Sequence, residues 1–316
     1  MLLAKQVDFM AYGPICAICS AILVVISLVS LAFAGLQFGL DFTSGTSVRL
    51  SFSETVVLDE VNTVLQDNGY DDALVVSFGS DREIRIIVPV DGTVAESDQA
   101  ANAVVVGETI AELLGNNINS EIILEGSDYV SSKVGSELAE QGGLGILVSI
   151  GIILVYIAMR FQLKFALGTV IALAHDVIIT AGTFSVLQME FDLTILAAIL
   201  AIIGYSVNDT IVVMDRIREN FRRMRKATPS EVINYSLNQT LDRTLITSGT
   251  TLIVVLAVLF VGGDATRGFC IAMTLGITIG TYSSIYIAAY STLLMKVTKE
   301  DLMPPARESA DLEKIP

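Results

Sequence analysis

The sequence predicts a polytopic α-helical membrane protein with six transmembrane helices and one small α+β domain between the first two helices. Apolar residues make up 53% of the chain and charged residues 17%, and the mean hydropathy is +0.66. Six apolar runs reach the roughly 20 residues that a membrane-spanning helix needs. A long polar stretch with its own strand and helix patterns separates the first two runs.

Each predicted span is an apolar run with polar residues at both ends. The runs cover residues 14–33, 142–159, 165–187, 193–214, 245–261 and 268–294. The first run is longer than the core of a signal peptide, and no clean small-residue cleavage site follows it. We therefore expect the first run to remain as a span.

The basic residues predict the orientation in the membrane. With the N-terminus inside, 14 of the 19 Lys and Arg residues lie in cytoplasmic segments, as the positive-inside rule requires. Residues 1–13, the basic connection 215–244 and the tail 295–316 are therefore expected in the cytoplasm. Residues 34–141 are expected on the opposite, outer side of the membrane.

The pattern of the outside segment predicts a ferredoxin-like domain with the order β-α-β-β-α-β. The expected strands are Gly45–Phe52, 73–78, 83–90 and 118–124. Ser53 is expected to cap the first helix, and Gly115 to end a second helix that begins at residue 95. Since this segment has no Cys, no His and no Gly-rich loop before a helix, we expect no catalytic chemistry in it.

The outside segment also carries the charge imbalance of the chain. Residues 35–141 contain nineteen acids and four bases, which accounts for the whole net charge of −15. A solvated domain surface explains the imbalance. An acidic face that attracts positively charged partners is the alternative interpretation.

Asp209 is an acidic residue inside the fourth span. An ionised carboxylate at the centre of a span costs about 2.5–3.5 kcal/mol on insertion scales. Ser206 and Thr210 share the helix face of Asp209, and Asn208 lies beside it. We therefore expect Asp209 to be neutral, paired or in a wet cavity.

Arg243 stands at the start of the fifth span, and Thr247 follows on its face. Its long side chain can reach the depth of Asp209. The two residues form either a static interhelical ion pair or a proton relay, which needs a titratable acid and a basic partner. His175 and Asp176 in the third span either form local hydrogen bonds or support such a relay.

The basic connection is predicted to end in an amphipathic helix. Thr228 and Glu231 form a capping box with Pro229 at the first helical position. The helix is expected to run through Thr240, and its apolar face is expected to lie on the membrane or on a partner. The residues of that face are Val232, Ile233, Leu237 and Leu241.

Five motifs, in order along nearly the whole chain, resemble the SecF family, the smaller subunit of the bacterial SecDF protein-export factor. They occupy residues 39–46 (GLDFTSGT), 134–138 (VGSEL), 174–177 (AHDV), 204–220 (GYSVNDTIVVMDRIREN) and 241–251 (LDRTLITSGTT). The first motif contributes Asp41, Phe42, Thr43 and Gly45.

The resemblance implies half of an RND-like transporter that pairs with SecD. Such a unit uses the proton motive force to promote late export of preproteins across the bacterial inner membrane. The SecYEG channel, SecA and YajC are the further partners that the resemblance implies. On the residue-by-residue match, Asp209 and Arg243 correspond to the charged positions of the family that are tied to proton coupling.

Two other functions are compatible with the residues: a purely structural assembly subunit of the translocon, and half of a small-molecule or lipid exporter. We expect no cofactor and no nucleic-acid partner. Besides the partners that the resemblance implies, we expect contact with the translocating preprotein and with membrane lipids. Because His175 is the only histidine, this chain alone builds no His-based metal site. The three cysteines all lie in predicted spans, which argues against a disulfide framework.

Overall fold

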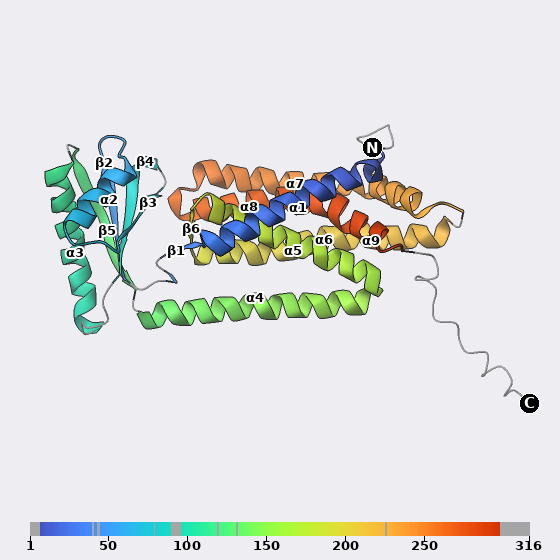
Figure 1. Cartoon of the computed structure of the whole chain (residues 1–316), viewed down its shortest axis with the longest axis horizontal. Coiled ribbons are helices and arrows are strands. Elements are labelled where there is room, and N and C mark those ends of the chain that lie inside the picture. Colours follow the sequence, from blue (N-terminus) through green and yellow to red (C-terminus); the bar gives the residue numbers. More distant parts are fainter. Residues whose placement is uncertain are drawn as a thin grey trace, which may run out of the picture.

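The structure is a computed structural model, and it describes residues 7–39, 41–42, 45–78, 80–89, 96–118, 120–130, 132–224 and 226–297. A bundle of long helices carries an α+β domain at one end (Figure 1). The bundle helices are α1 (Phe9–Phe33), α4 (Ser132–Arg160), α5 (Leu163–Val186), α6 (Leu193–Arg223), α7 (Pro229–Val261), α8 (Asp264–Ser283), the π-helix η1 (Ser284–Ala288) and α9 (Ala289–Leu294). The described residues contain six helical stretches long and apolar enough to cross a membrane, which confirms the predicted fold class.

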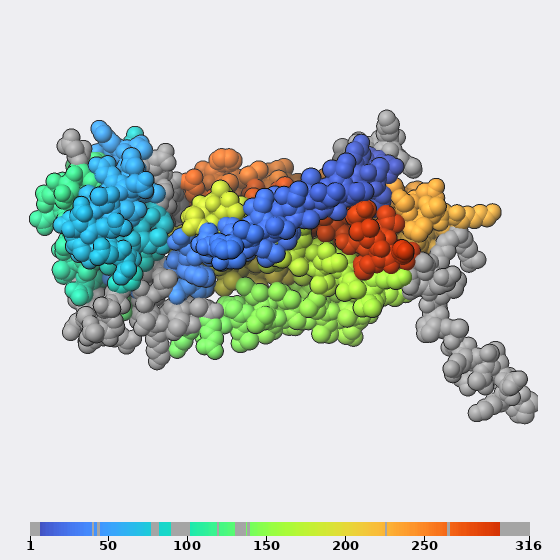
Figure 2. Space-filling view, in the orientation of Figure 1, coloured from blue at the N-terminus to red at the C-terminus, as the bar shows by residue number. Residues whose placement is uncertain are grey.

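Helices α5, α6 and α8 form the centre of the bundle. More than half of each of their apolar windows is buried, against 11% for α1 and 6% for α4. Figure 2 shows α1 crossing the outside of the bundle and α4 running along one edge. The centre is tightly packed, because a Cβ added to Gly276 of α8 would lie 2.3 Å from the Ile202 side chain of α6.

Helix α7 begins as predicted, but its length and the surroundings of its apolar face differ from the prediction. The capping box forms as expected, since the Glu231 amide donates to Thr228 Oγ1 at 3.3 Å and the Thr228 amide donates to Glu231 Oε2 at 2.8 Å. The helix then continues to Val261 instead of ending near Thr240. The prediction that its apolar face lies on the membrane or a partner is wrong, because that face is buried in this chain's own core.

The start of α7 is held against the start of α1 by two asparagines. Asn234 Oδ1 accepts from the Met10 amide at 3.0 Å. Asn238 accepts from the Val7 amide at 2.9 Å and donates to the Val7 carbonyl at 2.8 Å. This docking explains why the first turns of α7 stay inside the bundle.

The α+β domain has the ferredoxin-like order that the sequence predicts. Its elements are β2 (Gly45–Phe52), α2 (Leu58–Asp67), β3 (Leu74–Phe78), β4 (Ser80–Val88), α3 (Glu96–Asn117) and β5 (Ile122–Val130). The four strands form an antiparallel sheet in the order β3-β4-β2-β5. The apolar face of the sheet, with Val48, Leu50 and Ile86 fully buried, packs against α2 and α3.

Two helix boundaries in this domain differ from the prediction. Helix α2 begins at Leu58 with Val57 as its N-cap, because the Ser53 hydroxyl instead accepts from the Glu121 amide at 3.2 Å. Helix α3 continues through Gly115 to Asn117, whose side chain donates to the Leu113 carbonyl at 2.8 Å. The expected turn of residues 79–82 is shortened, since β4 begins at Ser80; Gly79 lies outside the described residues.

A two-stranded parallel sheet was not predicted. It pairs β1 (Gln37–Phe38), directly after α1, with β6 (Glu190–Phe191), in the connection between α5 and α6. The pair lies between the α+β domain and the bundle (Figure 1). It ties the exit of α1 to the start of α6.

Candidate functional site

Asp209 lies buried in the middle of α6, with 6% of its surface exposed. Its Oδ1 accepts a hydrogen bond from Thr244 Oγ1 of α7 at 3.1 Å. Its Oδ2 is buried and has no hydrogen-bond partner among the described residues. Ser284, the first residue of η1, lies beside the carboxyl group. Three helices therefore enclose a carboxylate that is only half satisfied.

Arg243 does not pair with Asp209 in this structure. Its side chain is exposed, and no ion pair within 4.0 Å joins it to Asp209 among the described residues. The neighbouring Thr244 makes the contact instead. Thr244 was not predicted, although Ser236, Thr240, Thr244 and Ser248 form a row of hydroxyl residues at every fourth position of α7.

The predicted companions of Asp209 divide between two surfaces. Ser206 and Thr210 are buried, each with 1% exposed surface. Asn208 and Thr247 are exposed, like Arg243. The polar residues of α6 and α7 thus line both the inside of the bundle and its outer face.

Asp176 of α5 is a second buried carboxylate. It is fully buried, and it accepts hydrogen bonds from Ser206, from Ser283 at 2.7 Å and from the neighbouring His175 Nδ1 at 2.8 Å. His175 Nε2 is buried without a partner among the described residues. The predicted pair therefore forms and extends to α6 and α8.

The π-helix η1 connects the two carboxylates. Ser283 immediately before it donates to Asp176, and Ser284 at its start lies beside Asp209. On α6, Ser206 contacts Asp176 and stands one turn before Asp209. Single-turn π-helical segments inside α-helices occur often at functional sites. A shift of α8 at this point would change the surroundings of both carboxylates.

Ser248 of α7 extends the polar core towards the α+β domain. Its hydroxyl accepts from Thr281 Oγ1 of α8 at 2.7 Å and from the Tyr205 hydroxyl of α6 at 3.3 Å. Hydroxyl groups can both donate and accept hydrogen bonds. Ser248 therefore joins α6, α7 and α8 through hydroxyl groups alone.

The motif that follows α1 joins the bundle to the α+β domain. Asp41 Oδ2 accepts from the amide of Leu193, the first residue of α6, at 3.1 Å. The ring of Phe42 stacks on Phe191 with centroids 6.1 Å apart. Gly45 has φ of +151°, and a Cβ there would lie 2.3 Å from the Val88 carbonyl oxygen, so only glycine fits. Thr43 lies outside the described residues.

An ion pair that the sequence did not predict crosses the same junction. Arg85 Nη1 of β4 donates to both oxygens of Glu190 in β6, at 2.8 and 2.9 Å. Burial raises the pKa of Glu190 above its ordinary value of 4.5, although the positive charge of Arg85 acts in the opposite direction. This pair links the sheet of the α+β domain to the connection between α5 and α6.

Comparison with known proteins identifies the family. Residues 110–299 match the family described as protein export membrane protein SecD/SecF, C-terminal, and residues 29–56 match the SecD/SecF GG motif. The chain is 44% identical over 315 residues to protein translocase subunit SecF of Vibrio alginolyticus, with 99% of this chain and 98% of the relative covered. It is 45% identical over 306 residues to the SecF subunit of Pseudomonas aeruginosa, covering 96% and 97%.

A solved structure agrees with the sequence relatives. The crystal structure of SecDF from Thermus thermophilus, described as a translocon-associated membrane protein, superposes with a TM-score of 0.80 at 33% identity. The match covers 94% of this chain but 39% of the SecDF chain. The protein is therefore a multi-pass membrane protein of the SecD/SecF class of export proteins. Within that class, the chain belongs to the SecF family of protein translocase subunits, which are transport proteins rather than enzymes.

Proposed function

We propose that this chain pairs with SecD in the bacterial inner membrane and that the pair uses the proton motive force to promote late export of preproteins. The family match supports the role in export. The SecDF chain is much longer than this one, which supports a separate partner that supplies the other half of an RND-like unit. SecYEG, SecA and YajC are the further partners that we propose from the family resemblance.

The observation that carries the proton-coupling proposal is the environment of Asp209. A carboxylate with one orphaned oxygen, buried in a membrane span, is costly when ionised. Protonation removes that cost and turns the carboxylate into a hydrogen-bond donor. The free energy of the arrangement of α6, α7 and η1 therefore depends on whether Asp209 carries a proton.

Arg243 has a place in this proposal as the basic partner that Asp209 lacks in the present arrangement. Its position beside Thr244 puts it next to the residue that contacts Asp209. Formation of the ion pair would stabilise the ionised acid, and its loss would favour protonation. The half-satisfied carboxylate and the exposed arginine are then one of two states of the cycle.

Helix α6 offers a mechanical link from Asp209 to the α+β domain. Asp209 stands 17 residues after Asp192, the N-cap of α6, which is about 25 Å of helix. At that end, Asp41 binds the first amide of α6, and the preceding β6 holds Arg85 through Glu190. A displacement of α6 would reach the α+β domain, which we propose lies in the periplasm and engages the emerging preprotein.

The membrane potential sets how much the loss of proton coupling can slow export. One charge that crosses the field gains about 2.3 kcal/mol per 100 mV. If that gain is transmitted through Asp209, its loss slows the driven step by up to about fifty-fold.

The test is export of a pulse-labelled secretory protein in cells whose only copy carries Asp209→Asn. Asp242→Asn is the matched control, since it removes a half-buried carboxylate next to Arg243. We expect export to stall in Asp209→Asn and to stay normal in Asp242→Asn, with this chain and SecD at wild-type amounts in both. Export that is normal, or that falls only with the amount of complex, would make Asp209 an assembly residue.

A further inference from the structure

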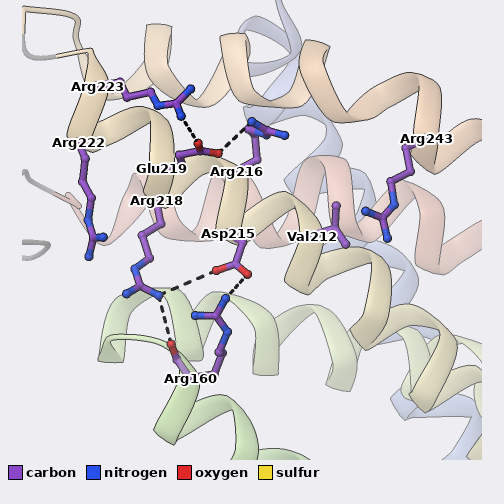
Figure 3. A pocket seen from close by; sticks show the side chains of 9 residues that line it. All are labelled: Arg160, Val212, Asp215, Arg216, Arg218, Glu219, Arg222, Arg223 and Arg243. Atoms are coloured by element: carbon purple, nitrogen blue, oxygen red, sulfur yellow. Dashed lines mark hydrogen bonds and ion pairs between the residues drawn. The ribbon is translucent and has the colours of Figure 1, made fainter.

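A pocket lined by arginines lies at the end of the bundle opposite the α+β domain. It has a volume of about 600 Å³ and opens between α4, α6 and α7. Figure 3 shows the side chains that surround it. The lining residues are Arg160, Val212, Asp215, Arg216, Arg218, Glu219, Arg222, Arg223 and Arg243. The proposed topology places this pocket at the cytoplasmic surface of the membrane.

The pocket carries an excess of positive charge. Six arginines face two carboxylates, so four positive charges are not neutralised within the lining. Asp215 pairs with Arg160 and lies 3.9 Å from Arg218, while Glu219 holds Arg216 and Arg223. The remaining two arginines, Arg222 and Arg243, form no ion pair with any described residue.

The two carboxylates hold the guanidinium groups in place. Asp215 fixes an arginine from α4 and one from α6 on the same side of the pocket (Figure 3). Arg218 also donates to the Arg160 carbonyl at 3.4 Å, and its Nε is buried without a partner among the described residues. A topology signal alone needs positive charge near the membrane but does not need side chains from three helices to converge on one cavity.

Guanidinium groups are the side chains best suited to bind phosphate, because their planar donors match its oxygens two at a time. The surroundings also fit an amphiphilic ligand. Met159, directly before Arg160, exposes 84% of its surface, and Tyr156 of α4 and Ile246 of α7, each about one helical turn from a lining arginine, expose about half of theirs; these residues form an apolar rim beside the pocket. We propose that the pocket binds a phosphate-bearing anion, and the apolar rim favours the headgroup of an anionic phospholipid over free phosphate.

The first arm of the test measures lipid retention by the complex of the full chain with SecD. The complex is reconstituted in phosphatidylcholine nanodiscs that contain a minor fraction of phosphatidylglycerol, and bound lipid is counted by native mass spectrometry. Arg222→Gln is the variant, since the side chain is exposed and its loss breaks no ion pair among the described residues. Lys226→Gln is the control, because Lys226 is exposed on the same end but does not line the pocket.

We expect Arg222→Gln to weaken phosphatidylglycerol binding about five-fold and Lys226→Gln to leave it unchanged. Arg222→Lys should restore part of the loss, because it keeps the charge without the planar donors. The second arm adds inorganic phosphate to the complex in phosphatidylcholine alone. Saturable phosphate binding that Arg222→Gln weakens would show that the pocket is an anion site whose ligand is free phosphate rather than a lipid headgroup.

Two outcomes would overturn the proposal. Equal retention of phosphatidylglycerol by wild type and both glutamine variants, without phosphate binding, would leave the arginines as a topology signal. Binding that appears only after SecD is removed would show that an acidic segment of the partner, not a phosphate group, occupies the pocket.

Discussion

The ion pair between Arg85 and Glu190 yields a prediction about how the α+β domain is held on the bundle. Both side chains are mostly buried, with 19% and 16% exposed, and two hydrogen bonds of 2.8 and 2.9 Å join them. Arg85→Met leaves the Glu190 carboxylate in the same buried place without its cation. Loss of one partner from a buried pair costs about 3–5 kcal/mol. Allowing for the partial exposure here, we expect about 2 kcal/mol of destabilisation.

The pH dependence of this effect follows from the pKa of Glu190. Its folded pKa is raised above 4.5, so the folded state keeps the proton at pH values where the unfolded state has lost it. The contribution of Glu190 to stability is therefore full below about pH 4.5 and declines as the pH rises through the folded pKa. Arg85→Met removes an interaction that lowers this pKa, so the deficit of the variant should be larger at about pH 8 than at about pH 5.

Thermal unfolding of the purified chain in detergent, followed by circular dichroism, measures this effect. The variants are Arg85→Met, Glu190→Gln and the double variant, each at both pH values. Since neutral Gln needs no cation, the double variant should be more stable than the sum of the single losses predicts. Additive losses, or an Arg85→Met deficit that is equal at both pH values, would refute the coupling of the two residues.

Two further predictions concern the centre of the bundle. Asp176→Ala leaves the donors of Ser206, Ser283 and His175 buried without an acceptor, so we expect about 3 kcal/mol of destabilisation. Asp176→Asn keeps one acceptor oxygen and should therefore be destabilised less. The unfolding assay above checks this order, and equal losses would contradict it. Gly276→Val should cost about 1–3 kcal/mol because its side chain would collide with Ile202, whereas Gly204→Ala has no atom within 4 Å and should be neutral. Equal stability of these two variants would show that α6 and α8 pack less closely than described.

The sequence predicted the parts of the structure that local patterns encode. Apolar runs revealed the six spans, and alternation with turn residues revealed the ferredoxin-like domain. The capping box at Thr228 was also visible, because all of its residues lie within four positions. The place of Asp209 inside a predicted span was visible in the sequence, but its burial between α6, α7 and η1 was not.

The features that the sequence did not predict depend on contacts between residues far apart in the chain. Arg85 and Glu190 are 105 positions apart, and β1 pairs with a strand about 150 positions later. Thr244 was not predicted, because only the packing of α6 on α7 decides whether Thr244 or the neighbouring Arg243 faces Asp209. The face containing Val232 resembled a surface helix because the local sequence does not show that the first turns of α7 dock on the start of α1, more than 200 positions earlier.

The central claim is that protonation of Asp209 couples the proton gradient to export. Its most direct test compares the effect of an uncoupler on the export step that follows SecA in membranes with wild-type chain and with Asp209→Asn, at equal amounts of complex. We predict that the uncoupler slows wild-type export to the rate of the variant and leaves the variant unchanged. If the uncoupler instead slows the variant by the same factor as wild type, the gradient acts elsewhere and Asp209 does not couple it.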